Sequence, residues 1–238
     1  MRTKKLRNLI VKARKGLDWP ILDNHDDSPV YRILSDPGSR SHIVHIPADP
    51  EARDDGLNYL HELGHAALCE QVHPVFAASS HFSATTGKEQ FTMSAPALQA
   101  ASDWFIGHWL HDMAPRQFKA NLGNELEVVE KIFSREEPPP IDVFMDAALV
   151  VAQAIAYLDA PVDCGGKLKE AVDAFSSENA DKPAEAPFLR LVNSLMAIYT
   201  PLRARIANDG EYAVWNIYLP GEGTTERVER SGLSQACA

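Results

Sequence analysis

Cysteine is scarce in this chain and is scattered along it. Only three occur, at Cys69, Cys164 and Cys237, and none forms a Cys-x-x-Cys pair. An odd number of isolated cysteines argues against both a disulfide framework and a thiolate metal cluster, and it agrees with a reducing compartment. The fold is therefore expected to depend on its hydrophobic core.

Long hydrophobic runs are also missing. The longest, residues 147–158, is interrupted by Gln153, and it is shorter than the ~20 apolar residues that cross a bilayer. The basic N-terminal residues are followed by only Leu9-Ile10-Val11 before Lys12, which is too short for the hydrophobic region of a secretory signal. We therefore expect a cytoplasmic protein with no membrane partner.

Positive charge is in short supply. The chain has 23 Lys and Arg against 33 Asp and Glu, a net charge of -10, and seven of the 23 lie within residues 1–15, where there is no acid. An acidic body makes nucleic acid an unlikely main partner. The 238 residues, 45% of them hydrophobic, suit one large domain or a domain with a helical appendage.

Hydrophobic periodicity predicts helices with a few short strands. The runs 30–34 and 41–46 flank Asp36-Pro37-Gly38 and predict a β-hairpin. A helix is predicted over about 55–71, with Asp54 or Asp55 as its cap. Further helices are predicted at 3–17, 96–111, 117–134, 141–160 and 188–199, and a strand at 213–219. The irregular chain comprises a loop or a short irregular strand pair at 73–95, a polar linker at 176–187 and a frayed end from 221 onward.

The chemically informative motif is His61-Glu62-Leu63-Gly64-His65, an HExxH match on the helix predicted over 55–71. Residues four apart share one helix face, so His61 and His65 can donate two imidazole nitrogens to one Zn²⁺ ion. Glu62 lies about 100° further round the helix, where it can serve as general acid and base beside the ion. Gly64, costly inside a helix, suggests close approach by another segment or a substrate.

A catalytic zinc site needs a third protein ligand, for which Asp103 is our prediction. Its helix face is otherwise apolar, and a lone carboxylate on such a face is costly unless it is paired or binds a cation. Glu89, His108 and His111 remain alternatives. The group that stabilises the developing oxyanion stays open among Tyr59, His73, His81 and His108.

On these residues the chain resembles the zincin metallopeptidases, and among them the gluzincin-like ImmA/IrrE family. The similarity covers roughly residues 30–115: a strand pair, the HExxH helix, and a later helix carrying residues 103–110. Where that family has its metal-binding glutamate, residues 99–102 contain no acid, and Asp103 is the nearest carboxylate. The resemblance implies a peptidase that often acts on one regulatory protein, with the strand Ile43–Ile46 pairing with an extended substrate.

The resulting expectation is an α+β protein. Residues 1–115 are predicted to form a zincin-like core with an N-terminal helix, and residues 116–238 a helical portion packed on it. The predicted activity is hydrolysis of a peptide bond in a peptide or protein substrate, with Zn²⁺ as cofactor. The alternative is a catalytically silent zinc module that binds a regulatory partner. Oligomeric state is left open.

Overall fold

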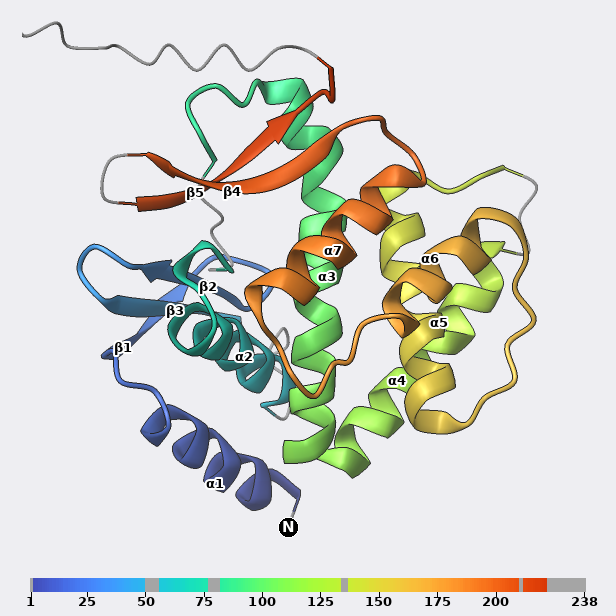
Figure 1. The fold of residues 1–238 in the computed structure, drawn as a ribbon. Coiled ribbons are helices and arrows are strands. Elements are labelled where there is room, and N and C mark those ends of the chain that lie inside the picture. Colours follow the sequence, from blue (N-terminus) through green and yellow to red (C-terminus); the bar gives the residue numbers. More distant parts are fainter. Residues whose placement is uncertain (1, 50–55, 77–81, 134–136, 210–211, 222–238) are drawn as a thin grey trace, which may run out of the picture.

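The protein is described from a computed structural model, which places residues 2–49, 56–76, 82–133, 137–209 and 212–221 (Figure 1). It is mixed α and β, so the expected α+β class is confirmed. In chain order the elements are α1 (Arg2–Lys15), β1 (Ile21–Asp26), β2 (Arg32–Asp36), β3 (Ser41–Pro47), α2 (Leu57–Gln71), a 3₁₀ turn (Pro74–Phe76), α3 (Lys88–Met113), α4 (Pro115–Phe133), α5 (Ile141–Leu158), α6 (Gly166–Ser176), α7 (Glu185–Ala197), β4 (Arg203–Asp209) and β5 (Tyr212–Tyr218).

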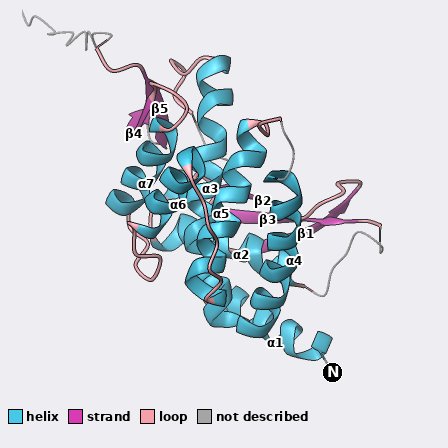
Figure 2. Ribbon diagram, turned by 90° about the vertical axis from the view of Figure 1, so that its right-hand side faces the viewer, coloured by secondary structure: helices cyan, strands magenta, loops and turns pink. Residues whose placement is uncertain are grey.

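A three-stranded sheet, in the order β1-β3-β2, lies on one side of the molecule (Figure 2). The predicted hairpin is β2 and β3, which pair antiparallel. Strand β1, which the sequence did not predict, pairs parallel with β3. Because β3 has a neighbour on each side, the expectation that Ile43–Ile46 pairs with a substrate is wrong: no edge of that strand is free. The edges of this sheet are β1 and β2.

Helix α2 packs against this sheet through its apolar face, where Leu60, Leu63 and Ala66 are fully buried. Its start is fixed by Gly56, whose φ of 105° lies in the left-handed region that glycine adopts without steric cost. The caps proposed from sequence, Asp54 and Asp55, fall outside the described residues. The helix is otherwise where its periodicity placed it.

The end of α2 is fastened to the sheet by a buried polar network. The Glu70 carboxylate lies 2.8 Å from His42 Nε2 and accepts hydrogen bonds from the backbone N–H groups of Asp18 and Trp19. On its other side His42 Nδ1 lies 2.7 Å from the Ser35 hydroxyl. A Ser-His-acid chain of this kind has the composition of a hydrolytic triad, but His42 is wholly buried. It therefore serves to hold α2 in register with the sheet.

Helix α3 is longer than the sequence indicated. It begins at Lys88 rather than at Pro96, which lies inside it, so the prediction of irregular chain over 73–95 is wrong for residues 88–95. The first turns are mainly polar and carry little periodicity, but tertiary contacts hold them: Phe91 meets Phe82 edge to face, and the Tyr199 hydroxyl donates to the Met93 carbonyl. Gln90 accepts a hydrogen bond from the Gly87 backbone N–H at the helix start.

The remaining helices gather around α3, which runs through the centre of the molecule (Figure 1). Helices α4 and α5 match their predictions, whereas α7 begins at Glu185, inside the predicted polar linker. Helix α6 and strand β4 were not predicted. Strand β5 was predicted, and it pairs with β4 and, through a short bridge at Trp215, with Phe82. The expected irregular tail lies, from residue 222, outside the described residues.

Helix α5 alone, among the described residues, is long and apolar enough by length and composition to cross a bilayer. The apolar run 147–158 considered in the sequence is too short to cross a bilayer, whereas the complete helix has 18 residues. The helix contacts α3, α4 and α6, and residues such as Met145, Ala148 and Val151 are buried against them. Its apolar composition is accounted for by its place in the protein core.

Candidate metal centre

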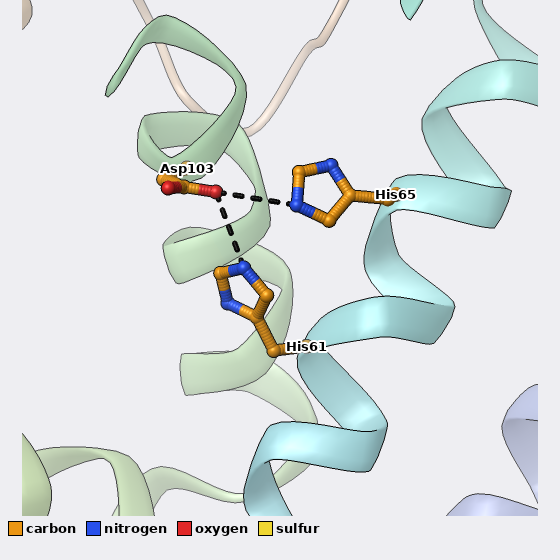
Figure 3. A group of neighbouring side chains, drawn as sticks. All are labelled: His61, His65 and Asp103. Atoms are coloured by element: carbon orange, nitrogen blue, oxygen red, sulfur yellow. Dashed lines mark ion pairs between the residues drawn. The ribbon is translucent and has the colours of Figure 1, made fainter. Parts of the chain in front are cut away.

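His61 and His65, one turn apart on α2, face the Asp103 side chain on α3 (Figure 3). Asp103 Oδ1 lies 3.2 Å from His61 Nε2 and 3.5 Å from His65 Nε2. One donor atom from each of the three residues falls within 4.8 Å of the others, and this is the one such group of His, Cys, Asp and Glu found among the described residues. The structure thus brings together the three residues that the sequence proposed as ligands.

The distances between these atoms suit a zinc ion. Ligand atoms at about 2.1 Å from a tetrahedral centre lie about 3.4 Å from one another, close to the two observed separations. Two imidazoles and one carboxylate form a donor set typical of catalytic zinc, with a position left for water. Among the described residues, buried Asp103 Oδ1 has no hydrogen-bond partner beyond its contacts with the two histidines, an arrangement that a cation would satisfy. The three residues therefore fit the metal.

Two glycines allow the helices to approach this closely. A Cβ atom on Gly64, between the two histidines, would lie 2.7 Å from Ile106 Cγ2 on α3, so the close approach predicted at this position is confirmed. On α3, a Cβ atom on Gly107 would lie 2.1 Å from Gln153 Nε2 on α5. Gln153 in turn donates a hydrogen bond to the backbone carbonyl of Asp103, at 3.2 Å. Helix α3 is thereby clamped between α2 and α5 at the level of the site.

The metal-free site carries its charge unevenly. Burial lowers the pKa of His61, but the neighbouring Asp103 and Glu62 carboxylates raise it more strongly, to about 9. Burial and the positive charge on His61 lower the pKa of His65 to about 4. Burial raises the pKa of Asp103, yet the two histidines leave it below its usual value. At neutral pH the site holds a His61–Asp103 ion pair beside a neutral His65.

His65 lacks one feature of many zinc-binding histidines. Its Nδ1 is buried and has no hydrogen-bond partner in the part of the chain that the structure describes, whereas a metal-ligating histidine usually donates its second ring N–H to a carbonyl or carboxylate. The orientation of the ring is set instead by packing, because His65 is only 8% exposed.

Glu62 lies beside the three residues and is not one of them. It is 9% exposed and contributes to the wall of the cavity that contains His61 and Asp103. Burial raises the pKa of its carboxyl group, with a smaller upward contribution from Asp103. A buried carboxylate of raised pKa next to the site has the position and the acidity that a proton-transfer group needs.

The cavity above the site has a volume of about 620 Å³ and lies between α2, α3, α4, α5 and the chain leading into β2. Its size is in the range of small-molecule and peptide side-chain sites. Sequence reasoning missed several of its residues, because they become neighbours only in the folded chain. The most polar of these are Tyr31, Asn58, Gln99, Asn121, Glu125, Asp146 and Gln153.

The other candidates from the sequence lie elsewhere. Glu89 is exposed in the first turn of α3. His108 Nε2 pairs with Asp181 at 2.6 Å, and the His111 ring stacks on Tyr157. None of these three residues lines the cavity.

Of the groups considered for oxyanion stabilisation, the described Tyr59, His73 and His108 do not line the cavity either. The Tyr59 hydroxyl donates to Asp23 and accepts from Arg14, and His73 Nδ1 accepts from the Val75 backbone N–H. His81 falls outside the described residues.

Comparison of the chain with protein-family models, with curated proteins and with solved structures gives no match in any of the three.

Proposed function

We propose that the protein is a zinc-dependent peptidase of the zincin type. The observation that carries this proposal is the convergence of His61 Nε2, His65 Nε2 and Asp103 Oδ1, with His61, Asp103 and Glu62 on the wall of one cavity. An HExxH helix packed on a small sheet, and a third donor from a second helix, support the resemblance to zincins that the sequence indicates.

The roles of the residues follow from their positions. His61, His65 and Asp103 would hold the ion, which when bound supplies Lewis acidity toward a carbonyl group and lowers the pKa of water. Glu62 accepts the proton of the attacking water and delivers it to the leaving amine. Its raised pKa brings it nearer to neutral pH, where a single carboxyl group performs both transfers most effectively.

An extended substrate could pair with the edge strand β2 rather than with β3, the strand expected from the sequence. Residues Pro29, Val30 and Tyr31 line the cavity and lead directly into β2, which is an edge strand. A peptide entering the cavity along this edge would pair with β2 by β-augmentation. A regulatory protein with an exposed extended segment would be a substrate of this kind.

The alternative function is a zinc site without turnover that supports a protein-interaction module. Both functions need the three ligands, but only the peptidase needs Glu62, because this carboxylate is not a ligand. Substitution of Asp103 should therefore impair both functions, whereas substitution of Glu62 should impair only the peptidase.

The test compares Glu62→Gln, Asp103→Ala and the exposed control Glu130→Gln, by elemental analysis and by mass spectrometry of a random peptide library. We expect about one zinc per chain in wild type, Glu62→Gln and Glu130→Gln, and little in Asp103→Ala. Cleavage should fall at least ~100-fold in Glu62→Gln, which loses the general base, and remain in Glu130→Gln. Unchanged cleavage in Glu62→Gln would rule out the mechanism. Zinc binding without any cleavage by the wild type would favour the silent module.

A further inference from the structure

Two carboxylates outside the proposed catalytic group face the same cavity from neighbouring helices. Glu125 projects from α4 and Asp146 from α5, and both line the space above His61 and Asp103. Asn121 donates a hydrogen bond of 2.7 Å to Glu125 Oε1. Within the described parts of the chain, neither carboxylate has a lysine or arginine at ion-pair distance.

The charge of the cavity is strongly one-sided. The described residues that line it include four carboxylates, those of Glu62, Asp103, Glu125 and Asp146, and no lysine or arginine. One divalent ion held by neutral histidines offsets only part of this charge. Negative charge remains for another cation to balance, and it remains on the side of the cavity formed by α4 and α5.

Glu125 and Asp146 are accessible to solvent, but partial burial beside the cavity and the acids around them penalise their charge. Burial, together with the charges of Asp103 and Asp142, raises the pKa of Asp146 to about 6. Burial also raises the pKa of Glu125, and the charges of Asp103 and Asp146 add to this effect. The charge of His61 opposes this effect on Glu125. Because the other acids repel each carboxylate, and no lysine or arginine among the described residues lies at ion-pair distance, a bound cation would stabilise both.

The walls beside the carboxylates are apolar. Val128 and Val129 on α4 and Val143 and Val150 on α5 line this part of the cavity. A small hydrated metal ion gains nothing from such walls. A lysine or arginine side chain does, because its aliphatic stem packs on apolar surface while its charged end reaches a carboxylate. Apolar walls ending in carboxylates match that combination.

We infer that the part of the cavity formed by α4 and α5 binds a lysine or arginine side chain of the substrate and so gives the enzyme specificity for basic peptides. The inference rests on the proposed function and names the substrate class of that site. Glu125 and Asp146 are its specificity-determining residues.

The test uses two probes that differ only in the positive charge. Lysine hydroxamate and norleucine hydroxamate share a metal-binding group and an unbranched side chain of similar length, but only lysine carries the ammonium group. Their affinities are measured through the visible absorption of the cobalt-substituted full-length protein. We compare wild type, Glu125→Gln, Asp146→Asn, the double variant, and Glu130→Gln as an exposed control on the same helix. Circular dichroism confirms that each variant is folded.

Lysine hydroxamate is expected to bind the wild type and Glu130→Gln roughly tenfold to hundredfold more tightly than norleucine hydroxamate, as a charge-assisted contact provides. The preference should shrink in each single variant and disappear in the double variant. Norleucine hydroxamate should bind all variants equally well.

Three results would overturn the inference. The first is equal affinity of the two probes for the wild type, or no response to either. The second is a lysine preference that survives in the double variant. The third is a second cobalt ion per chain that the double variant loses, which would assign the two carboxylates to a metal. Normal cobalt uptake in the first two cases leaves the proposed metal centre standing, whereas no cobalt uptake would overturn both proposals.

Discussion

At the scale of single residues, the site without metal is stabilised by an ion pair that exists only while His61 is protonated. His61 and Asp103 form an ion pair at 3.2 Å, and the pKa of His61 is raised to about 9. This raised pKa stabilises the metal-free fold fully below the unfolded value of about 6.5, and the contribution is lost as the pH rises through about 9. His65, with a pKa of about 4, is already neutral at physiological pH.

This arrangement predicts that metal binding releases a proton. Between pH 6 and 8 the ion must displace one proton from His61 and none from His65, so the apparent affinity should rise about tenfold per pH unit and level off above about pH 9. Calorimetric titration with zinc in two buffers of different ionisation enthalpy measures the proton count directly. An affinity that does not change between pH 6 and 8 would contradict the assigned charge of His61.

At the scale of elements, the position of α3 against α5 depends on the absence of a side chain at Gly107. An added Cβ would meet Gln153 Nε2 at 2.1 Å, and Gln153 is also the residue that bonds to the Asp103 carbonyl. A side chain added at this point would therefore disturb both the contact between α3 and α5 and the position of Asp103.

The corresponding prediction compares two Gly→Ala variants. Gly107→Ala should lower the free energy of unfolding by about 1–3 kcal/mol, because overpacking outweighs the gain in helix propensity. Gly123→Ala on α4, where an added Cβ meets nothing within 4 Å, should raise it by about 0.5–1 kcal/mol. Urea denaturation measures both. Equal stabilisation by the two substitutions would show that a methyl group at residue 107 is accommodated without displacing Gln153.

Some elements could be predicted from the sequence and others could not. HExxH, a local motif on a strongly periodic helix, identified α2 and two of the three grouped residues, and the isolated Asp103 on an apolar face identified the third. The start of α3 and the strands β1 and β4 were missed, because their polar sequences are ordered by pairing and by contacts distant in the chain, such as that of Tyr199 with Met93. Glu125 and Asp146 carried no local signal, since only the packing of α4 on α5 brings them to the cavity.

At the scale of the whole molecule, one continuous core joins the two portions distinguished in the sequence. Buried residues of the sheet and α2, such as Val44 and Leu60, belong to the same cluster as Met145, Leu191 and Trp215 from the later helices and strand. Helix α3 contacts elements of both portions. Neither portion buries its apolar surface without the other.

A shared core predicts one cooperative unfolding transition. The four tryptophans sample the molecule well: Trp19 stacks on His42 beside the sheet, Trp104 and Trp109 lie on α3, and Trp215 lies on β5. In protein labelled with fluorotryptophan, all four ¹⁹F signals should lose their native intensity at the same urea concentration. A midpoint for Trp19 that differs from that of Trp215 would show that the two portions unfold separately.

The central position of α3 also restricts how this chain can change in length. One residue inserted into the helix between Asp103 and Gly107 would turn one of them by about 100° relative to the other, separating Asp103 from the histidines or Gly107 from α5. Insertions in the loop at 159–165 or in the turn at 37–40 would disturb neither contact. Divergent copies of this protein should therefore vary in the length of their loops, while the spacing between Asp103 and Gly107 stays fixed.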